Sequence, residues 1–265
     1  MAGNTVDDPA LAPQTPEEAE HKPWAKWWGN HLAEVRWQAE FARLVADPIW
    51  RGEGVERGNG MAVMTIPGFL AGDSSLGPMR SWLKRVGYKP YRSAISFNVD
   101  CSDLVTDRLS SKLQHLAEQN GPVALIGHSR GGHFAKALAV RHPDLVSSVI
   151  SAGAGLDTPF AISRPTQAAV QVVREVHSRA ENRVGNKGCM TESCTCQFAQ
   201  DYASEFPPEV PLTSIYSRGD GVVWWRACLV DYADCVEVTG SHVGLAFNRK
   251  VYAVLAEKLA TVAGK

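Results

Sequence analysis

Short apolar runs alternate with amphipathic segments along most of the chain. Runs that are short enough for buried strands occur at residues 61–66, 93–98, 123–127, 146–153, 212–217 and 235–240. The segments between and after them carry apolar residues at helical spacing and predict helices at residues 78–87, 103–119, 130–141 and 248–263. Strands that alternate with helices are typical of a mostly parallel central sheet with helices on both faces, so we predict the α/β class.

The first 50 residues follow a different pattern. Residues 1–22 are rich in Pro, Asp and Glu, and we expect a disordered tail there. Residues 24–45 predict a helix with two apolar stripes, formed by Trp24, Trp28, Leu32 and Val35 and by Trp37, Phe41 and Leu44. We therefore expect a Trp-rich helical extension over residues 23–50. It either packs on the main domain or serves as a lid, a homodimer contact or an interfacial anchor.

Residues 156–208 interrupt the alternation of strands and helices. This stretch contains several prolines, a helical run near residues 166–180 and a Cys-rich loop. We interpret it as an insertion between two strands of a main domain that spans residues 51–265.

Composition and charge exclude several classes of protein. Of the 265 residues, 45% are hydrophobic and 21% are charged, which is ordinary for a globular protein. The net charge of −1 gives no electrostatic case for binding nucleic acid. No apolar run reaches the roughly 18–20 residues of a transmembrane helix. The polar, acidic N-terminal segment lacks the features of a secretion signal, so we expect a cytoplasmic protein.

The six cysteines do not form a recognisable metal motif. Cys194 and Cys196 form a C-x-C with Cys189 nearby, but the chain has no C-x-x-C pair. Three cysteines without a fourth ligand make a weak zinc site, and we expect reduced thiols and no metal. A disulfide between Cys228 and Cys235 stays open at this point.

The strongest local motif is Gly127-His128-Ser129-Arg130-Gly131, a G-x-S-x-G. A predicted strand precedes it and a predicted helix follows it. An abrupt turn from strand to helix exposes a hydroxyl, and the flanking glycines prevent clashes. The amides at the start of the helix can stabilise a developing oxyanion. This context makes Ser129 a candidate nucleophile.

A serine nucleophile needs a base and an acid that orients the base. Asp220 follows the predicted strand at residues 212–217, and His242 follows the next one. The order Ser129, Asp220, His242 is expected when all three side chains lie at the carboxyl ends of parallel strands. Asp157, which follows the strand at residues 146–153, is the alternative acid.

Four segments give the chain a resemblance to the α/β-hydrolase fold superfamily, and within it to microbial lipases and esterases. They are PGFLAGD (67–73), GHSRGG (127–132), SRGDGVV (217–223) and GSHVGL (240–245), which frame residues 60–263. The resemblance implies an α/β-hydrolase domain over residues 51–265 with a cap or lid over about 156–208. It also implies that the amides of Phe69 and Arg130 form an oxyanion hole, with Leu70 as a substitute for Phe69. Pro67 stands where these enzymes usually carry a histidine.

The function expected from these residues is hydrolysis of a carboxylic ester through an acyl-serine intermediate. The same three side chains would also serve an acyltransferase or a thioesterase, and a non-catalytic binding protein on this fold is a further alternative. The partner is then a small-molecule or lipid ester. Apolar residues of the insertion, together with Phe69, indicate an apolar pocket. The expected substrate contacts are Leu70, His128, Trp224 and Val243. No cofactor is implied, since the glycine-rich turn lacks the lysine and the spacing of a phosphate-binding loop.

Overall fold

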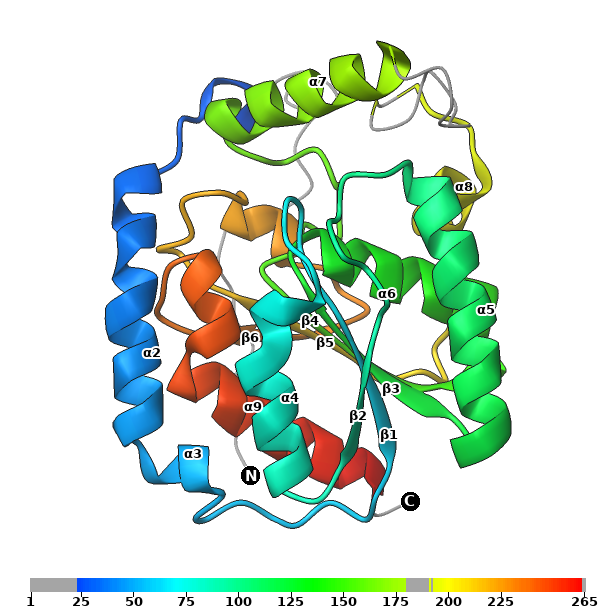
Figure 1. Ribbon diagram of the computed structural model, residues 1–265. Helices are drawn as coiled ribbons and strands as arrows, with labels where there is room; N and C mark the ends of the chain where they lie inside the picture. The colour runs from blue at the N-terminus through cyan, green and yellow to red at the C-terminus, as the bar shows by residue number, and fades with distance from the viewer. Residues whose placement is uncertain (1–22, 180–190, 192, 264–265) are drawn as a thin grey trace.

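A parallel sheet forms the centre of the protein. The computed structural model describes residues 23–179, 191 and 193–263, and within them six strands lie in the order β2-β1-β3-β4-β5-β6 (Figure 1). All neighbouring strands are parallel. The strands are β1 (Ala62–Ile66), β2 (Lys89–Arg92), β3 (Val123–His128), β4 (Val146–Ala152), β5 (Leu212–Tyr216) and β6 (Asp234–Glu237). Parallel strands bring their carboxyl ends to one edge, so the loops after β1, β3, β5 and β6 meet there.

Helices cover both faces of the sheet (Figure 1). Met64 and Ile66 of β1 belong to one apolar core and Val63 to the other, because successive side chains of a strand point to opposite faces. The first core includes residues of α5 (Ser102–Asn120), α6 (Arg130–Arg141) and α8 (Gln197–Ala203). The second includes residues of α2 (Trp37–Ala46), α3 (Pro48–Arg51), α4 (Gly77–Arg85) and α9 (Arg249–Ala263). Short 3₁₀ helices occupy Pro23–Lys26, His31–Arg36, Asp73–Leu76, Pro143–Leu145, Trp225–Cys228 and Val243–Phe247. The predicted α/β class, with helices on both faces, is confirmed.

The prediction of a strand at residues 93–98 is wrong. The strand between α4 and α5 is β2. It pairs with β1 at the edge of the sheet, where Pro90 is tolerated because an edge strand has unpaired positions. After β2 the chain leaves the sheet. The amide and the hydroxyl of Ser93 donate to Asp73 Oδ1 at 2.9 and 2.8 Å, and Ala94 has a φ of 69°. The apolar residues of 93–98 therefore belong to a loop.

The prediction of one continuous helix over residues 24–45 is also wrong. Two 3₁₀ helices precede α2, and residues 27–30 between them are not helical. Gly29 has a φ of 68°, and a Cβ at this position would overlap the Gly221 carbonyl. The Asn30 side chain then accepts a hydrogen bond from the Ala33 amide at 3.2 Å and begins the next helix. Close contact with the loop around Gly221 thus overrides the helical pattern of the sequence.

The N-terminal helices pack on their own chain through one of the two predicted apolar stripes. Leu44 is fully buried, and the Phe41 ring lies 5.3 Å from the ring of Phe247. The other stripe faces solvent, with Leu32 86% and Val35 66% exposed. The stripe of Trp37, Phe41 and Leu44 therefore packs on the main domain, which is one of the roles considered for this helical extension. The predicted tail at residues 1–22 lies outside the described residues.

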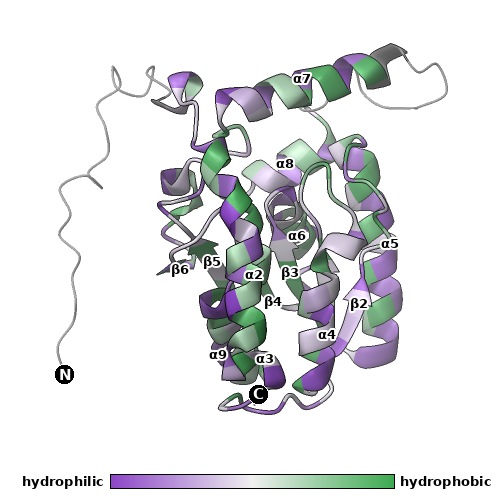
Figure 2. Cartoon of the chain, turned by 60° about the vertical axis from the view of Figure 1, so that its left-hand side comes forward, coloured by the Kyte–Doolittle hydropathy of each residue, from purple (hydrophilic) through white to green (hydrophobic). Residues whose placement is uncertain are grey.

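The interrupting segment contributes to two regions of the structure. Helix α7 (Arg164–Arg179) crosses above the carboxyl edge of the sheet, at the top of Figures 1 and 2. Helix α8 instead joins the core beside α6, where Phe198 and Tyr202 are buried. Within the described residues, no helix combines the length and the apolar composition that crossing a bilayer requires.

Replacement of Trp82 tests the core on the α4 face of the sheet. Trp82 is fully buried, its Nε1 donates to the Ile49 carbonyl at 2.7 Å, and its ring lies 4.9 Å from that of Tyr252. We expect Trp82→Ala to lower the free energy of unfolding by about 3–5 kcal/mol, because it leaves a cavity. Urea denaturation measures this. The control, Trp28→Ala, removes a side chain that is 63% exposed and is expected to stay within about 0.5 kcal/mol of the unmodified protein. Equal losses in the two variants would contradict the described packing.

Candidate active site

Ser129 lies at a sharp turn between β3 and α6. Its φ of 54° and ψ of −127° are strained for a residue with a side chain. The turn fits only because its neighbours are glycines. A Cβ at Gly127 would overlap the Gly131 backbone, and a Cβ at Gly131 would overlap the Ile66 carbonyl. The predicted strand–turn–helix context of the motif is therefore present, with Ser129 at its apex.

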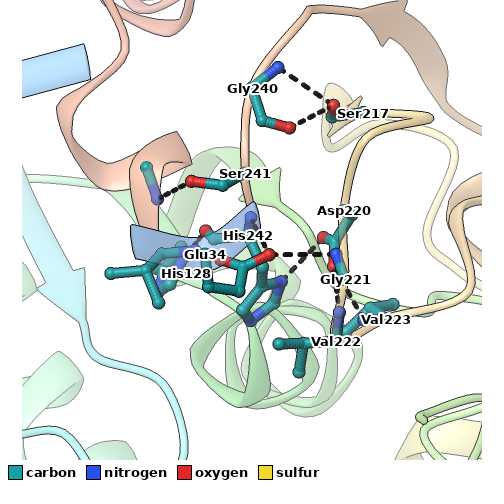
Figure 3. Close-up of polar contacts among 12 residues, drawn as sticks. Glu34, His128, Ser217, Asp220, Gly221, Val222, Val223, Gly240, Ser241 and His242 are labelled. Atoms are coloured by element: carbon teal, nitrogen blue, oxygen red, sulfur yellow. Dashed lines mark hydrogen bonds and ion pairs between the residues drawn. The ribbon is translucent and has the colours of Figure 1, made fainter. Parts of the chain in front are cut away.

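His242 and Asp220 form a buried pair (Figure 3). Nδ1 of His242 lies 2.7 Å from Oδ2 of Asp220, and the two residues are 5% and 6% exposed. The other carboxylate oxygen of Asp220 accepts hydrogen bonds from the amides of Val222 and Val223, both at 2.8 Å. Because a carboxylate only accepts, Nδ1 is the donor, and Nε2 of His242 is left to take up a proton.

Ser217 joins the loops that carry these two side chains. Its hydroxyl donates to the Gly240 carbonyl at 2.6 Å and accepts from the Gly240 amide at 3.1 Å. It also accepts from the Gly219 amide at 3.1 Å. The loop after β5, which holds Asp220, is thereby fixed to the loop after β6, which holds His242.

The surroundings of His242 favour its protonated form. Burial by itself would lower the pKa of His242, but the charge and hydrogen bond of Asp220, followed by the charge of Glu34, raise it above the usual value. The neighbouring His128 has the opposite character. Burial, followed by the charge of His242, lowers the pKa of His128 to about 4. His128 therefore stays neutral near pH 7. Its Nε2 lies 2.9 Å from the His242 carbonyl.

A cavity of about 1030 Å³ joins the candidate nucleophile and the candidate base, since Ser129 and His242 both line it. The Ser129 hydroxyl forms no hydrogen bond within the described part of the chain; such contacts often tighten only when substrate is bound. Asp157, the alternative acid, is exposed on the cavity wall. Nδ1 of His242 is paired with Asp220 instead.

The two residues expected to supply oxyanion donors also line this cavity. Phe69 follows β1, and Arg130 begins α6, where the helix dipole favours negative charge. The amide of Leu70, the substitute donor, is bonded to the Asn98 carbonyl at 3.3 Å. Asn98 is fully buried, and its Nδ2 donates to the Pro67 carbonyl at 2.8 Å. Asn98 thus holds the loop that carries Phe69, a role that the sequence analysis missed.

The predicted substrate contacts divide into two groups. Leu70 and Val243 line the cavity, as does Phe69. The apolar residues of the insertion that line it include Phe160, Ile162, Val170 and Phe198. His128 and Trp224 are not among the lining residues. His128 lies behind His242, bonded to its carbonyl, and the Trp224 ring packs edge-on against Trp27 at 5.6 Å. These two side chains support neighbouring loops rather than the cavity wall.

Helix α6 adds polar groups to the cavity wall. His133 and Lys136 follow Ser129 by four and seven residues, and all three line the cavity. Burial, followed by the charge of Arg130, lowers the pKa of His133 to about 3. Burial lowers the pKa of Lys136 to about 8, and its Nζ donates to the Leu156 carbonyl at 3.1 Å. At pH 7 the imidazole is neutral, and the amine is mostly protonated.

Two glutamates from the N-terminal helices reach the loops of the candidate site. Glu34 accepts hydrogen bonds from the amides of Gly221, His242 and Val243 at 3.0, 3.0 and 2.8 Å (Figure 3). Glu40 accepts from the amide and the hydroxyl of Ser241, both at 3.0 Å. The sequence analysis missed both residues. No local motif marks them, because their partners lie about 200 positions further along the chain.

No metal site emerges from the described residues, which contain no group of three or more His, Cys, Asp or Glu side chains arranged to hold an ion. Cys228 and Cys235 are free thiols, so the disulfide left open by the sequence does not form. Cys194 and Cys196 are also free, with sulfurs 3.3 Å apart. Cys189 lies outside the described residues.

Comparison with known proteins agrees with this architecture. Residues 110–179 match a family model described as the alpha/beta hydrolase fold. Solved structures that share the fold cover 88% and 78% of this chain. The chain has the α/β-hydrolase fold.

Structural neighbours of this α/β-hydrolase domain include enzymes of low sequence identity. The metagenomic carboxyl esterase MGS0156 is 14% identical, with a TM-score of 0.59 over 88% of this chain and 92% of the esterase. Lipase BlEst2 of Bacillus licheniformis is 15% identical, with a TM-score of 0.56 over 78% and 96%. A soluble variant of monoglyceride lipase from Saccharomyces cerevisiae is 16% identical, with a TM-score of 0.52 over 80% and 89%. No curated protein sequence matches the chain.

Nuclear magnetic resonance titration of the imidazoles tests the electrostatics of the site. We expect the midpoint of His242 to lie above the ordinary value of about 6.5, because Asp220 and Glu34 stabilise the imidazolium. His128 is expected to stay neutral until the pH falls to about 4. Asp220→Asn serves as the comparison and should lower the midpoint of His242. A His242 midpoint below 6.5 in the unmodified protein would contradict the described pair.

Proposed function

We propose that the protein hydrolyses carboxylic esters through an acyl-serine intermediate, with Ser129 as nucleophile, His242 as general base and Asp220 as the carboxylate that orients the base. One observation carries the proposal: a serine on a strained strand–helix turn and a buried, carboxylate-paired imidazole line the same cavity. A serine hydroxyl is a weak nucleophile near neutral pH and needs such a base. The esterase and the lipases that share the fold are consistent with this chemistry.

In the first half of the reaction, Oγ of Ser129 bonds to the carbonyl carbon of the ester, and its proton passes to Nε2 of His242. The electron pair of the carbonyl π bond moves to oxygen, where the amides of Phe69 and Arg130 donate to the oxyanion. The oxyanion then re-forms the carbonyl double bond, the bond between the acyl carbon and the alcohol oxygen breaks, and the imidazolium of His242 gives its proton to the departing alkoxide. The products are an alcohol and an acyl group esterified to Ser129.

In the second half, water attacks the acyl carbon and gives a proton to Nε2 of His242. The tetrahedral intermediate collapses, the bond to Oγ of Ser129 breaks, and the imidazolium returns the proton to the serine. The net reaction consumes one ester and one water and releases a carboxylic acid and an alcohol. Asp220 keeps its negative charge throughout and stabilises each imidazolium that forms.

The cavity indicates the class of ester. Apolar side chains from the loop after β1, from α7 and from α8 form much of its wall. A cavity of this kind binds the apolar part of a small ester or a lipid ester and leaves the scissile carbonyl at Ser129. In this proposal, α7 is the part of residues 156–208 that acts as the cap over the cavity. The exposed side chains of Leu32 and Val35 are the candidates for an interfacial or homodimer contact.

Ser129→Ala tests the proposed nucleophile. We expect turnover of p-nitrophenyl esters to fall by at least about a thousandfold, because only binding and oxyanion stabilisation remain. Steady-state release of p-nitrophenol measures the rate, and circular dichroism verifies that the variant is folded. The matched control is Ser111→Ala, which removes an exposed hydroxyl on α5 and should leave the rate unchanged. Turnover near the unmodified rate in folded Ser129→Ala would rule out the assignment.

A further inference from the structure

Glu34 contacts both loops of the candidate catalytic pair at once. Its Oε1 accepts from the Gly221 amide, which follows Asp220 directly, and from the His242 amide. Its Oε2 accepts from the Val243 amide. Figure 3 shows the carboxylate between the two loops, above the His242 ring. One side chain of the N-terminal region therefore fixes the backbone on either side of the contact between acid and base.

The N-terminal region is itself held in this position by close contacts with the domain. Gly29 and Asn30 pack so tightly against Gly221 that a Cβ at either glycine would overlap the facing backbone. Nε2 of His31 lies 2.7 Å from Oγ of Ser163, at the start of the segment that leads into α7. The carboxylate of Glu34 is thus presented from a backbone with little freedom to move.

Glu40 makes a comparable contact at Ser241, which directly precedes His242 in the loop after β6. Its carboxylate binds the amide and the hydroxyl of Ser241, and a Cβ at Gly244 would overlap it. Glu40 touches the loop of His242 but not the loop of Asp220. The two glutamates therefore make the same kind of contact, and of the two, Glu34 is the one that hydrogen-bonds to both loops.

Charge distinguishes the two glutamates as well. The titratable groups that face His242 are Asp220 on the loop after β5, His128 at the end of β3, His133 on α6 and Glu34. The two histidines have lowered pKa values and are neutral near pH 7. Among the described residues, the charges of Asp220 and Glu34 raise the pKa of His242, so both favour its protonated form.

We propose that Glu34 is a positioning residue for the proposed hydrolase reaction: it locks the loops of Asp220 and His242 together, and its negative charge stabilises the imidazolium that forms during proton transfer. The inference rests on the function proposed above. Glu34 is not among the residues that line the cavity, so in this proposal it acts through Asp220 and His242. On this account, the 3₁₀ helix that carries Glu34 (His31–Arg36) helps to align the proposed catalytic pair and is more than an appendage to the domain.

Glu34→Gln tests this role. The glutamine keeps one carbonyl acceptor, but it loses the charge and turns an amide donor toward a backbone amide. We expect kcat to fall about ten- to a hundredfold with little change in KM, because the reacting groups lose their alignment. We also expect the acid limb of the kcat/KM profile to move to lower pH, because a negative charge that raises the pKa of His242 is removed. p-Nitrophenyl ester hydrolysis between pH 4 and 9 measures both effects, with urea denaturation to verify folding.

Glu40→Gln is the matched control. It makes the same chemical change on a neighbouring helix, at a contact with the loop of His242 alone. We therefore expect the acid limb of its kcat/KM profile to keep the same midpoint. Glu34→Asp retains the charge on a shorter side chain; it should lower kcat while leaving the acid limb in place, and it tests the proposal if Glu34→Gln does not fold. An unchanged kcat and acid limb in Glu34→Gln, or an equal shift in Glu40→Gln, would overturn the proposal.

A second readout separates this proposal from the function on which it rests. A fluorophosphonate probe reports whether Ser129 is activated in the unmodified protein, and lack of labelling would count against the proposed function. Nuclear magnetic resonance titration of His242 in Glu34→Gln needs no turnover. A lowered His242 midpoint in that variant supports the positioning role whatever the probe shows, and an unchanged midpoint contradicts it.

Discussion

The buried contact between His242 and Asp220 is the constraint on which the rest of the site depends. Two ionisable groups removed from water are costly unless their geometry is closely held and their remaining atoms are hydrogen-bonded. Adjacent parallel strands β5 and β6 bring the two loops side by side, and Ser217 ties the loops together. The amides of Val222 and Val223 satisfy the second oxygen of Asp220. The sheet therefore brings Asp220 and His242 close together, and the hydrogen bonds of the loops stabilise the buried pair.

The N-terminal helices complete this arrangement from outside the sheet. Backbone amides in loops have no partner from a helix or a sheet, and such an amide needs another acceptor when it is buried. Glu34 and Glu40 provide acceptors for the amides of Gly221, Ser241, His242 and Val243 from a part of the chain about 200 residues away. Glu34 also places a negative charge beside a base that must become positive. Stability of the loops and tuning of the base thus arise from the same contacts.

The sequence predicted features that a motif or a regular pattern marks, and it missed those that contacts with distant residues decide. Hydrophobic periodicity and the G-x-S-x-G motif are local, so β3, the turn at Ser129 and α6 could be read from the residues. The strand expected at residues 93–98 failed because Ala94 takes a positive φ in a loop that Asp73 holds. The single helix over residues 24–45 failed because packing against Gly221 breaks it at Gly29. Glu34 could not be found, since surface glutamates on helices carry no signal of a distant partner.

Mass spectrometry of the protein quenched during ester turnover tests the central claim most directly. The account predicts a covalent acyl adduct on the peptide that contains Ser129, with the mass of the acyl group of the ester supplied. Replacement of His242 by glutamine should prevent the adduct from forming at a comparable rate, because the hydroxyl then has no base. An adduct on another residue, or turnover without any acyl-enzyme under conditions that slow its hydrolysis, would contradict the account.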